Sequence, residues 1–464
     1  MSFVVPLSVT LDSDGMNVVT SPPADSALRS VHTDARSVSS HALFWACQGY
    51  VMVAVACSSF FPMLFRYQEH AVIVLVVLSL GMCAIERVSP WIKTPLDLPL
   101  WLFMIWVLCT VPFATDSAYS FAEWKKFVAQ AGVLYWSLLV LDRCRRENLP
   151  QQILWALALT GAALAVYSLV DFAGRGGTWR DRYIRANAFR SDYNWLSTYM
   201  VMTIPVVGSL IVLGRLAWFR AAQALALALM GGAQLFSYTR GGWLGHAAQG
   251  LALAAMVGGR RLALWVLGLL AMAGAGLLVA SQAGFQRDTV AASTVDTRLT
   301  VWAIGLRQVA MHPVAGIGYG NNSFVKKFPE YSVEAQAQVP EGARIIPAMH
   351  NTFLMVALGS GLPALLSFVW IFVALLRRLI PIPWGAAWND RWSVLAAGIG
   401  LAVIGFAVRN LFDYMFMGSL AHIFWLLAAV GLTVTGSSWR SGGSGRQPGS
   451  PQDEGTSQAQ QPAA

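Results

Sequence analysis

Charged residues are scarce in this sequence. They make up 12% of its 464 residues, about half of the roughly 25% that is usual for a soluble globular domain. Apolar residues make up 56%, and they are concentrated in runs of about 17 to 25 residues, the length with which an α-helix crosses roughly 30 Å of hydrocarbon. The composition therefore argues against a soluble enzyme and predicts membrane-spanning helices.

Patterns of disulfide-forming and metal-binding residues are also missing. The five cysteines include no C-x-x-C pair, so the sequence predicts neither a disulfide framework nor a zinc site. Its D-x-D pair, Asp12 and Asp14, lies in the N-terminal tail, and the histidines are scattered along the chain. We expect no metal ion and no other cofactor.

Both ends of the chain are polar. Residues 1–40 begin without the cationic and apolar segments of a removable signal peptide, and residues 437–464 consist mainly of Gly, Ser, Gln and Pro. Little in either segment can be buried. We therefore expect a disordered tail on each side of a transmembrane domain at 41–436.

About twelve apolar runs divide the transmembrane domain. Their lengths predict an all-α polytopic membrane protein with about twelve transmembrane helices and one large outer loop at 284–349. The runs are 42–65, 71–85, 97–114, 127–141, 152–173, 193–213, 221–238, 241–258, 262–283, 351–376, 393–409 and 414–435.

The charges of the short loops set the expected orientation. With a cytoplasmic N-terminus, every short inside loop is basic, as the positive-inside rule requires, and both tails are cytoplasmic. The net charge of +9 follows from this topology, so we expect no nucleic-acid partner. The inside cations are Arg87, Lys93, Arg143, Arg145, Arg146, Arg215, Arg220, Arg260, Arg261, Arg377, Arg378 and Arg391.

Two outer segments contradict the charge rule. The loop 284–349 is long enough to be translocated regardless of its charge, but the Arg-rich loop 174–192 is short. Cations held outside against the rule indicate an anionic partner, with lipid headgroups as the alternative. In the short loop the candidate contacts are Arg182, Arg185 and Arg190.

The large outer loop contains an amphipathic segment. Residues 297–311 place Leu299, Trp302, Leu306 and Val309 at helical spacing, and a His-Pro pair ends the pattern. We expect a helix that lies on the membrane surface.

Three polar residues on the outer side are candidates for chemistry, two at the borders of apolar runs and one at the start of the amphipathic segment. Arg240 lies at a membrane boundary, where it reaches headgroups or pairs with an anion, and the glycines after it allow a helix or a ligand to approach. Arg298 follows Asp296 and Thr297, either of which can cap the helix, and a surface pair with Asp296 is the simpler interpretation. His350 opens the tenth run, as a polar anchor or as a base near neutral pH.

The glycine-rich stretch 316–321 has two interpretations. Its sequence, GIGYGN, can present backbone N–H groups to a phosphate, but it lacks the Lys-Ser/Thr of a P-loop. A plain turn is the simpler interpretation.

Three segments carry a family resemblance: FSYTRGGWLG at 236–245, DTRLTVWAIGLRQVAMHPVAGIGYGN at 296–321 and HNTFLMVALGSGLPALL at 350–366. In this order they resemble the O-antigen ligase and polymerase (Wzy-like) superfamily of bacterial envelope glycosyltransferases. The similarity covers roughly residues 190–410, whereas the first five runs match only in hydropathy and layout. The twelve runs and the single large outer loop resemble the ligase branch more closely.

The resemblance implies a GT-C-like fold with a periplasmic active site. The functional positions of the family match Arg240, with Leu244 in an Arg-x-x-x-Leu element, the loop arginine Arg298 and the helix-opening His350. The candidate substrate contacts are Arg182, Arg185, Arg190 and Asn351.

The resemblance further implies an O-antigen ligase of the bacterial inner membrane. Such an enzyme moves a glycan from undecaprenyl diphosphate to a sugar hydroxyl of lipid A-core, with inversion and without metal or ATP. Arg240 and Arg298 would stabilise the leaving diphosphate, and His350 would take the proton of the attacking hydroxyl. The expected partners are the lipid-linked donor, the lipid A-core acceptor and membrane lipids.

Two alternative functions stay open. An O-antigen polymerase would use the same arginines with an acceptor that is itself linked to a lipid diphosphate. A transporter or flippase would collect an anionic lipid-linked substrate. That class favours inverted repeats and broken helices in the membrane, and the sequence shows neither clearly.

Overall fold

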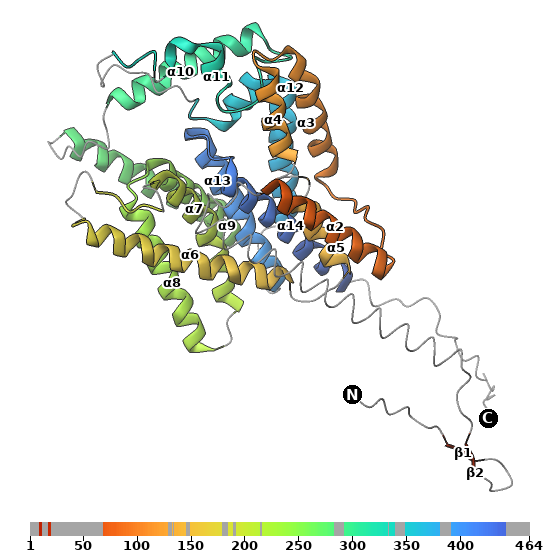
Figure 1. Cartoon of the computed structure of the whole chain (residues 1–464). Helices are drawn as coiled ribbons and strands as arrows, with labels where there is room; N and C mark the ends of the chain where they lie inside the picture. Colours follow the sequence, from red (N-terminus) through yellow and green to blue (C-terminus); the bar gives the residue numbers. More distant parts are fainter. Residues whose placement is uncertain are drawn as a thin grey trace, which may run out of the picture.

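The computed structural model is almost wholly helical (Figure 1). The strands found among the described residues are β1 (Val9–Leu11) and β2 (Asn17–Val19), which pair antiparallel inside the tail that we expected to be disordered. The apolar run 42–65 lies outside the described residues. The structure describes residues 9–11, 17–19, 68–128, 132, 134–144, 149–178, 184–188, 192–213, 216–282, 292–332, 334–338, 349–380 and 391–441.

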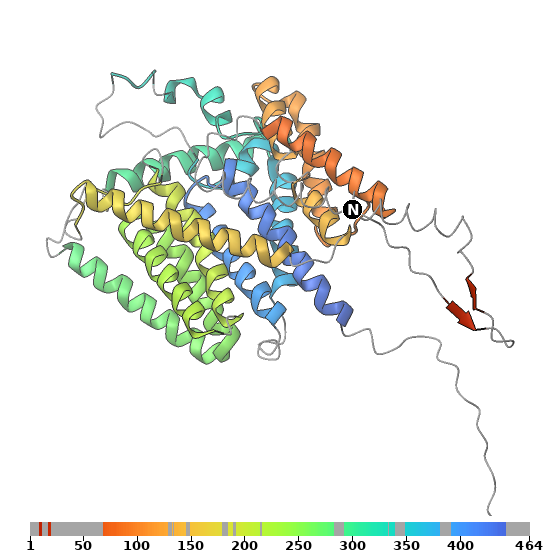
Figure 2. The same cartoon turned by 60° about the horizontal axis from the view of Figure 1, so that its bottom comes forward.

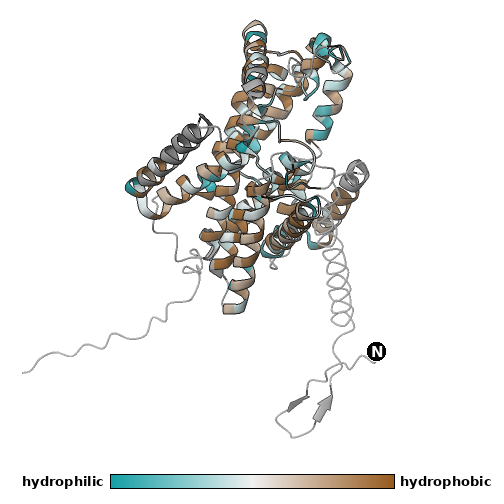
Figure 3. Ribbon diagram, turned by 90° about the vertical axis from the view of Figure 1, so that its left-hand side faces the viewer, coloured by the Kyte–Doolittle hydropathy of each residue, from teal (hydrophilic) through white to brown (hydrophobic). Residues whose placement is uncertain are grey.

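Long apolar helices form the body of the protein, and Figure 3 shows hydrophobic residues along most of their length. The helices are α2 (Gln68–Glu86), α3 (Asp97–Thr110), η2 (Val111–Phe113), α4 (Ser117–Phe127), α5 (Tyr135–Cys144), α6 (Leu149–Gly174), α7 (Tyr193–Leu213), α8 (Ala217–Phe236), α9 (Arg240–Gln282), α10 (Ala292–Met311), α11 (Ser323–Lys327), η6 (Pro329–Tyr331), α12 (Thr352–Leu379), α13 (Arg391–Phe412) and α14 (Gly418–Ser441).

Five helices of the described chain are long and apolar enough to cross a membrane: those at 149–174, 193–211, 352–379, 392–412 and 418–436. This is the architecture of a polytopic helical membrane protein. The other expected spans fall on α2, α3, α5, α8 and α9, which are helical. That they also cross, giving about twelve spans, stays a prediction, as does the outer side of the large loop.

Helix α13 is central to the packing. It contacts α7, α9, α12 and α14, while α6 and α8 pack together beside α7, and α6 also meets α14 (Figure 2). Phenylalanine rings fill the junction of α12, α13 and α14. The ring of Phe416 lies 5.2 Å from Phe368, 5.7 Å from Phe406 and 5.0 Å from Phe424, centroid to centroid. These contacts pack α12, α13 and α14 against one another next to the polar site.

Glycines let α9 approach α13 closely. A Cβ added to Gly245 would lie 3.1 Å from the carbonyl oxygen of Gly405, and one added to Gly241 would lie 3.0 Å from Nη1 of Arg409. Small residues at such contacts are typical of helix packing in membranes. The glycines after Arg240 therefore admit a neighbouring helix.

Helix α12 is broken within its length. Ser360 and Gly361 leave the helical conformation, Gly361 with φ 81° and ψ 179°, and Pro363 follows. The carbonyl of Ser360 accepts a hydrogen bond from Nε1 of Trp106 on α3, at 3.0 Å. We did not predict this break, which is possible inside a membrane because protein donors satisfy the freed backbone groups.

The glycine-rich stretch 316–321 supplies more of these donors. The N–H of Ile317 donates to the carbonyl of Leu358, and the N–H of Gly318 donates to the carbonyl of Gly359, both at 2.9 Å. Two of the N–H groups that could have bound a phosphate are thus hydrogen-bonded to α12. For these positions the phosphate-binding interpretation is wrong, and the stretch joins the outer loop to the broken helix.

We expect Gly361→Ala to destabilise the protein by about 1–3 kcal/mol, because its backbone conformation is restricted almost entirely to glycine. An added Cβ would also collide with the backbone of Val314. Thermal or detergent-induced unfolding of the purified protein measures the change.

Gly208→Ala in α7 is the matched control, since a Cβ there meets nothing within 4 Å. Replacing a helical glycine by alanine at an open position should stabilise by about 0.5–1 kcal/mol. Equal unfolding midpoints for the two variants would contradict the proposed role of Gly361.

Candidate active site

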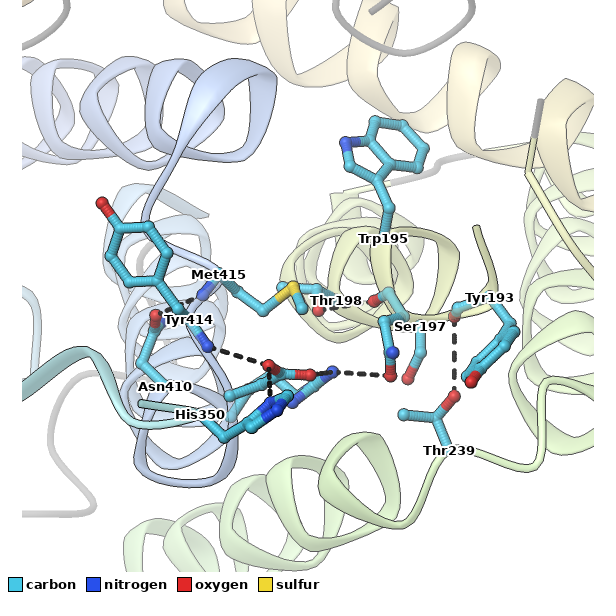
Figure 4. A network of polar contacts seen from close by, with 12 residues as sticks. Tyr193, Trp195, Ser197, Thr198, Thr239, His350, Asn410, Tyr414 and Met415 are labelled. Carbon is cyan, nitrogen blue, oxygen red and sulfur yellow. Dashed lines mark hydrogen bonds and ion pairs between the residues drawn. The ribbon is translucent and has the colours of Figure 1, made fainter. Parts of the chain in front are cut away.

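His350 occupies an unusual backbone position directly before α12. Its φ of 47° lies in the left-handed region, which few residues other than glycine adopt and which is enriched at functional sites. Asn351 caps α12, because its Oδ1 accepts the N–H of Leu354 at 2.9 Å. The Thr352 hydroxyl donates to Asn410 on α13. These neighbours hold His350 at the junction of α12 and α13 (Figure 4), and Asn351, an expected substrate contact, serves here as the cap.

Asp413 orients the His350 ring. Nδ1 of His350 lies 3.0 Å from Oδ1 of Asp413. Burial alone would raise the pKa of Asp413, but the hydrogen bond from His350 and the charges of Arg409 and Arg298 lower it to about 2. An ionised carboxylate only accepts hydrogen bonds, so Nδ1 is the nitrogen that carries the proton. Nε2 then has a free lone pair, and this atom is buried with no partner among the described residues.

Arg409 binds the second oxygen of the same carboxylate. This arginine is 1% exposed and lies within the apolar helix α13. Its Nη2 lies 3.1 Å from Oδ2 of Asp413 and 3.1 Å from Oδ1 of Asn194 on α7. The guanidinium therefore joins α13 to α7 and shares the Asp413 charge with His350. Figure 4 shows this network between Asn410 and Tyr414 on one side and Tyr193 and Thr239 on the other.

Arg298 lies close to both the carboxylate and the other arginines. Its charge acts on Asp413, on Arg409 and on Arg240, and its buried Nε has no partner among the described residues. Partial desolvation, together with the charges of Arg298 and Arg185, lowers the pKa of Arg240. An anion placed among these side chains would relieve their repulsion.

Helix α10 is positioned by a contact next to His350. Nε1 of Trp302 donates to the carbonyl of Met349 at 2.6 Å, and Arg298 lies one turn earlier on the same helix. The helix ends at Met311 as predicted but begins at Ala292. The expected capping role of Asp296 or Thr297 is therefore wrong, because both lie inside the helix.

The apolar face of α10 differs from the predicted stripe. Val301 and Val309 are buried, whereas Leu299 and Leu306 are more than half exposed. The protein-facing side is thus shifted around the helix, and a row of leucines points away from the bundle. That row is the kind of face with which a helix lies on a membrane surface.

Arg185 is the described member of the predicted Arg-rich contact set. The N–H of Ala186 donates to the carbonyl of Phe236 at 2.9 Å, which ties this loop to the end of α8. The Arg185 guanidinium lies over the ring of Tyr193, 4.4 Å from its centroid. Its charge reaches Arg240, whereas Arg182 and Arg190 lie outside the described residues.

Positive charge exceeds negative charge in this site. Four arginines interact with one another or with two aspartates, which leaves an excess of two positive charges when His350 is neutral. The arginines are Arg185, Arg240, Arg298 and Arg409, and the aspartates are Asp192 and Asp413. Within the described part of the chain no group of His, Cys, Asp and Glu side chains is arranged to hold a metal ion.

A histidine paired with a carboxylate, beside clustered arginines in a helical membrane protein, has groups suited to proton transfer and to binding an anion. Residues 225–369 match the O-antigen ligase family, and this match assigns that part of the chain to the O-antigen ligase and polymerase superfamily. The predicted resemblance is confirmed for these residues, and the match supports a transferase in general.

The family match has clear limits along the chain. It covers just under a third of the sequence, from α8 into α12, and it includes Arg240, Arg298 and His350. It does not include Arg409 or Asp413, and it does not separate a ligase from a polymerase. No curated protein matches the chain significantly.

Sequence reasoning missed Asp413, Arg409 and Asn194. A signal was present, because Arg409 and Asp413 are four residues apart at the end of an apolar run. Such spacing places two opposite charges on one helix face, and an ionisable residue inside a span is a functional candidate by default.

We expect Asp413→Asn to lower the stability of the purified protein by about 3–5 kcal/mol near neutral pH, because it leaves Arg409 buried without its counter-charge. The folded pKa of Asp413, about 2, lies below the ordinary value of 3.8. The ionised carboxylate therefore stabilises the fold above pH of about 4, and this contribution is lost as the pH falls toward 2. Melting temperatures measured across this range should converge at low pH.

Asp171→Asn is the matched control. Asp171 pairs with Arg175 at 2.6 Å, but both side chains are about one third exposed, so its loss should cost only about 0–1 kcal/mol. A melting temperature of Asp413→Asn equal to that of the wild type at pH 7 would show that the buried pair adds nothing.

Proposed function

We propose that this protein is an O-antigen ligase of the bacterial inner membrane. It transfers a glycan from undecaprenyl diphosphate to a sugar hydroxyl of lipid A-core, on the periplasmic side, and both of its termini are cytoplasmic. The observation that carries the proposal is Nε2 of His350, which has no partner among the described residues and belongs to a ring oriented by Asp413. The charge of Arg298 acts both on Asp413 and on Arg240. The family match to residues 225–369 supports the same reaction class.

His350 acts as the general base in this proposal. Nε2 accepts the proton of the acceptor hydroxyl while that oxygen attacks the anomeric carbon of the donor glycan. Nδ1 keeps its own proton and donates it in a hydrogen bond to Asp413. The Asp413 carboxylate stabilises the imidazolium that forms. A positioned base of this kind typically contributes about 10² to 10⁴ in rate.

Arg240 and Arg298 stabilise the leaving group. The bond between the anomeric carbon and the diphosphate oxygen breaks, and its electron pair stays on the diphosphate. Guanidinium groups bind such an oxyanion through two parallel hydrogen bonds, most strongly where water is partly excluded. Attack opposite the leaving diphosphate inverts the anomeric centre, and neither a metal ion nor ATP takes part.

Arg185 provides a further anionic contact, either to the far phosphate or to a phosphorylated acceptor core. Its charge reaches Arg240, which supports a place on the donor side. Arg182 and Arg190 are proposed for the same contact from neighbouring positions of the loop. Asn351 can still use its amide group toward substrate while its Oδ1 caps α12.

We expect His350→Gln and Arg298→Ala to reduce transfer by about 10² or more, because they remove the base and a leaving-group contact. Arg240→Ala should cause a similar loss. The assay uses purified full-length protein with lipid-diphosphate glycan and lipid A-core, and the transferred product is quantified.

His312→Gln and Arg307→Ala are the matched controls. Both side chains are exposed, and Arg307 lies on the side of α10 opposite to Arg298. They should keep nearly full activity, and a chelator should leave transfer by the wild type unchanged. Full activity of His350→Gln would remove the proposed base, and activity lost to chelator and restored by a divalent ion would show that a metal takes part.

The polymerase is the second candidate, since the family match covers both reactions. Deletion of the gene should leave lipid A-core without any attached glycan if the protein is the ligase. Core that carries one repeat unit would instead identify the polymerase. Electrophoresis of extracted lipopolysaccharide distinguishes the two patterns.

The transporter hypothesis has less support. The structure does contain a broken helix, α12, but its freed carbonyls at Leu358, Gly359 and Ser360 are bonded to protein donors. Transport sites in broken helices depend on backbone groups that face the substrate. Unchanged lipid-linked glycan export in the deletion strain would agree with the ligase.

A further inference from the structure

A buried arginine in α13 takes no direct part in the proposed transfer reaction. Arg409 is 1% exposed and lies inside an apolar helix, where an unpaired charge is costly. Its pairing is incomplete, because its buried Nε has no partner among the described residues. A residue retained at such cost, in contact with the carboxylate of the proposed base, calls for a functional explanation.

The geometry ties Arg409 to both halves of the site. Its Nη2 lies 3.1 Å from Asp413, the partner of His350. On the other side its guanidinium fits against Gly241, where an added Cβ would lie 3.0 Å from Nη1 and 3.3 Å from Cδ and Cζ. Gly241 directly follows Arg240 at the start of α9. One side chain thus contacts the proton-accepting pair and the backbone beside the leaving-group arginine.

Arg409 also limits how strongly the Asp413 carboxylate stabilises the protonated form of His350. The two oxygens of the carboxylate are divided, Oδ1 facing His350 and Oδ2 facing Arg409. A cation on Oδ2 offsets part of the negative charge that would otherwise stabilise the imidazolium. Removing that cation should make His350 keep its proton to higher pH.

Charged and titratable groups approach Arg409 from several elements. Asp192 precedes α7, Arg298 comes from α10, and Asp413 follows α13. Arg240 begins α9, His350 precedes α12, and Tyr414 follows Asp413. On α14 the titratable group is His422, whose Nδ1 is bonded to the carbonyl of Gly418. Arg409 is the member of this set that contacts Asp413 from within the bundle.

We propose that Arg409 is a positioning residue, which holds the His350–Asp413 pair in register with the start of α9 and sets the pH below which that pair is inactive. The proposal rests on the proposed transfer function. It assigns Arg409 no contact with substrate. It requires that the charge at position 409, in addition to its bulk, affects the reaction.

The test measures transfer against pH for purified full-length variants. Arg409→Gln should reduce transfer and move the acid limb of the profile to higher pH by roughly one unit. Arg409→Lys keeps the charge, so it should lower the rate while its acid limb stays near that of the wild type. A residue with a merely structural role would lower the rate without moving the limb.

Asn194→Asp provides a second, nearly isosteric test. It keeps an acceptor for Nη2 of Arg409 and adds a negative charge on the far side of the guanidinium, so its acid limb should also move to higher pH. This variant decides the question if Arg409→Gln does not fold. Arg378→Gln, at an exposed position in the last turn of α12, is the control and should leave the profile unchanged.

The possible results separate this inference from the proposed function. If His350→Gln abolishes transfer but the acid limbs of Arg409→Gln and Asn194→Asp coincide with that of the wild type, the inference about Arg409 is wrong and the base remains. If His350→Gln transfers as well as the wild type, the proposed base is wrong. A shift to higher pH in both variants supports the positioning role.

Discussion

The Asp413 carboxylate divides its two oxygens between a histidine and a guanidinium, and the geometry of the site depends on that division. His350 lies before α12, Arg409 lies within α13, and Asn194 on the other side of Arg409 belongs to α7. Three helices are therefore joined through one buried negative charge. Removing this negative charge would leave the buried cation of Arg409 unpaired. The arrangement of the three helices that keeps the pair together is therefore favoured.

Aromatic residues, glycines and further arginines surround this polar network. Phenylalanine rings of α12, α13 and α14 pack together around Phe416. Glycines at the start of α9 leave room for the guanidinium of Arg409. Arg240, Arg298 and Arg185 come from α9, α10 and the segment before α7, respectively. The site thus combines a buried histidine with arginines from a loop and from two further helices, and this arrangement suits the anionic lipid that we propose as its substrate.

The candidate residues that the sequence predicts stand at the boundaries of apolar or amphipathic segments. Arg240 and His350 each border an apolar run, Arg298 stands at the start of the amphipathic segment, and the end of α10 at Met311 follows from the His-Pro pair after it. Asp413 and Arg409 were missed because their significance depends on which helices pack together, and α13 could have contacted other partners. The break in α12 was missed although Gly359, Gly361 and Pro363 mark it in the sequence, because apolar residues continue on both sides of them.

The docking of the outer loop on α12 has a consequence for the assembly of the protein. The carbonyls of Leu358 and Gly359 depend on N–H groups at Ile317 and Gly318, and lipid cannot replace these donors. The donors precede the acceptors in the chain, so they leave the ribosome before α12 does. The loop can then receive the broken helix as it inserts, whereas α12 made without the loop would carry unsatisfied carbonyls into lipid.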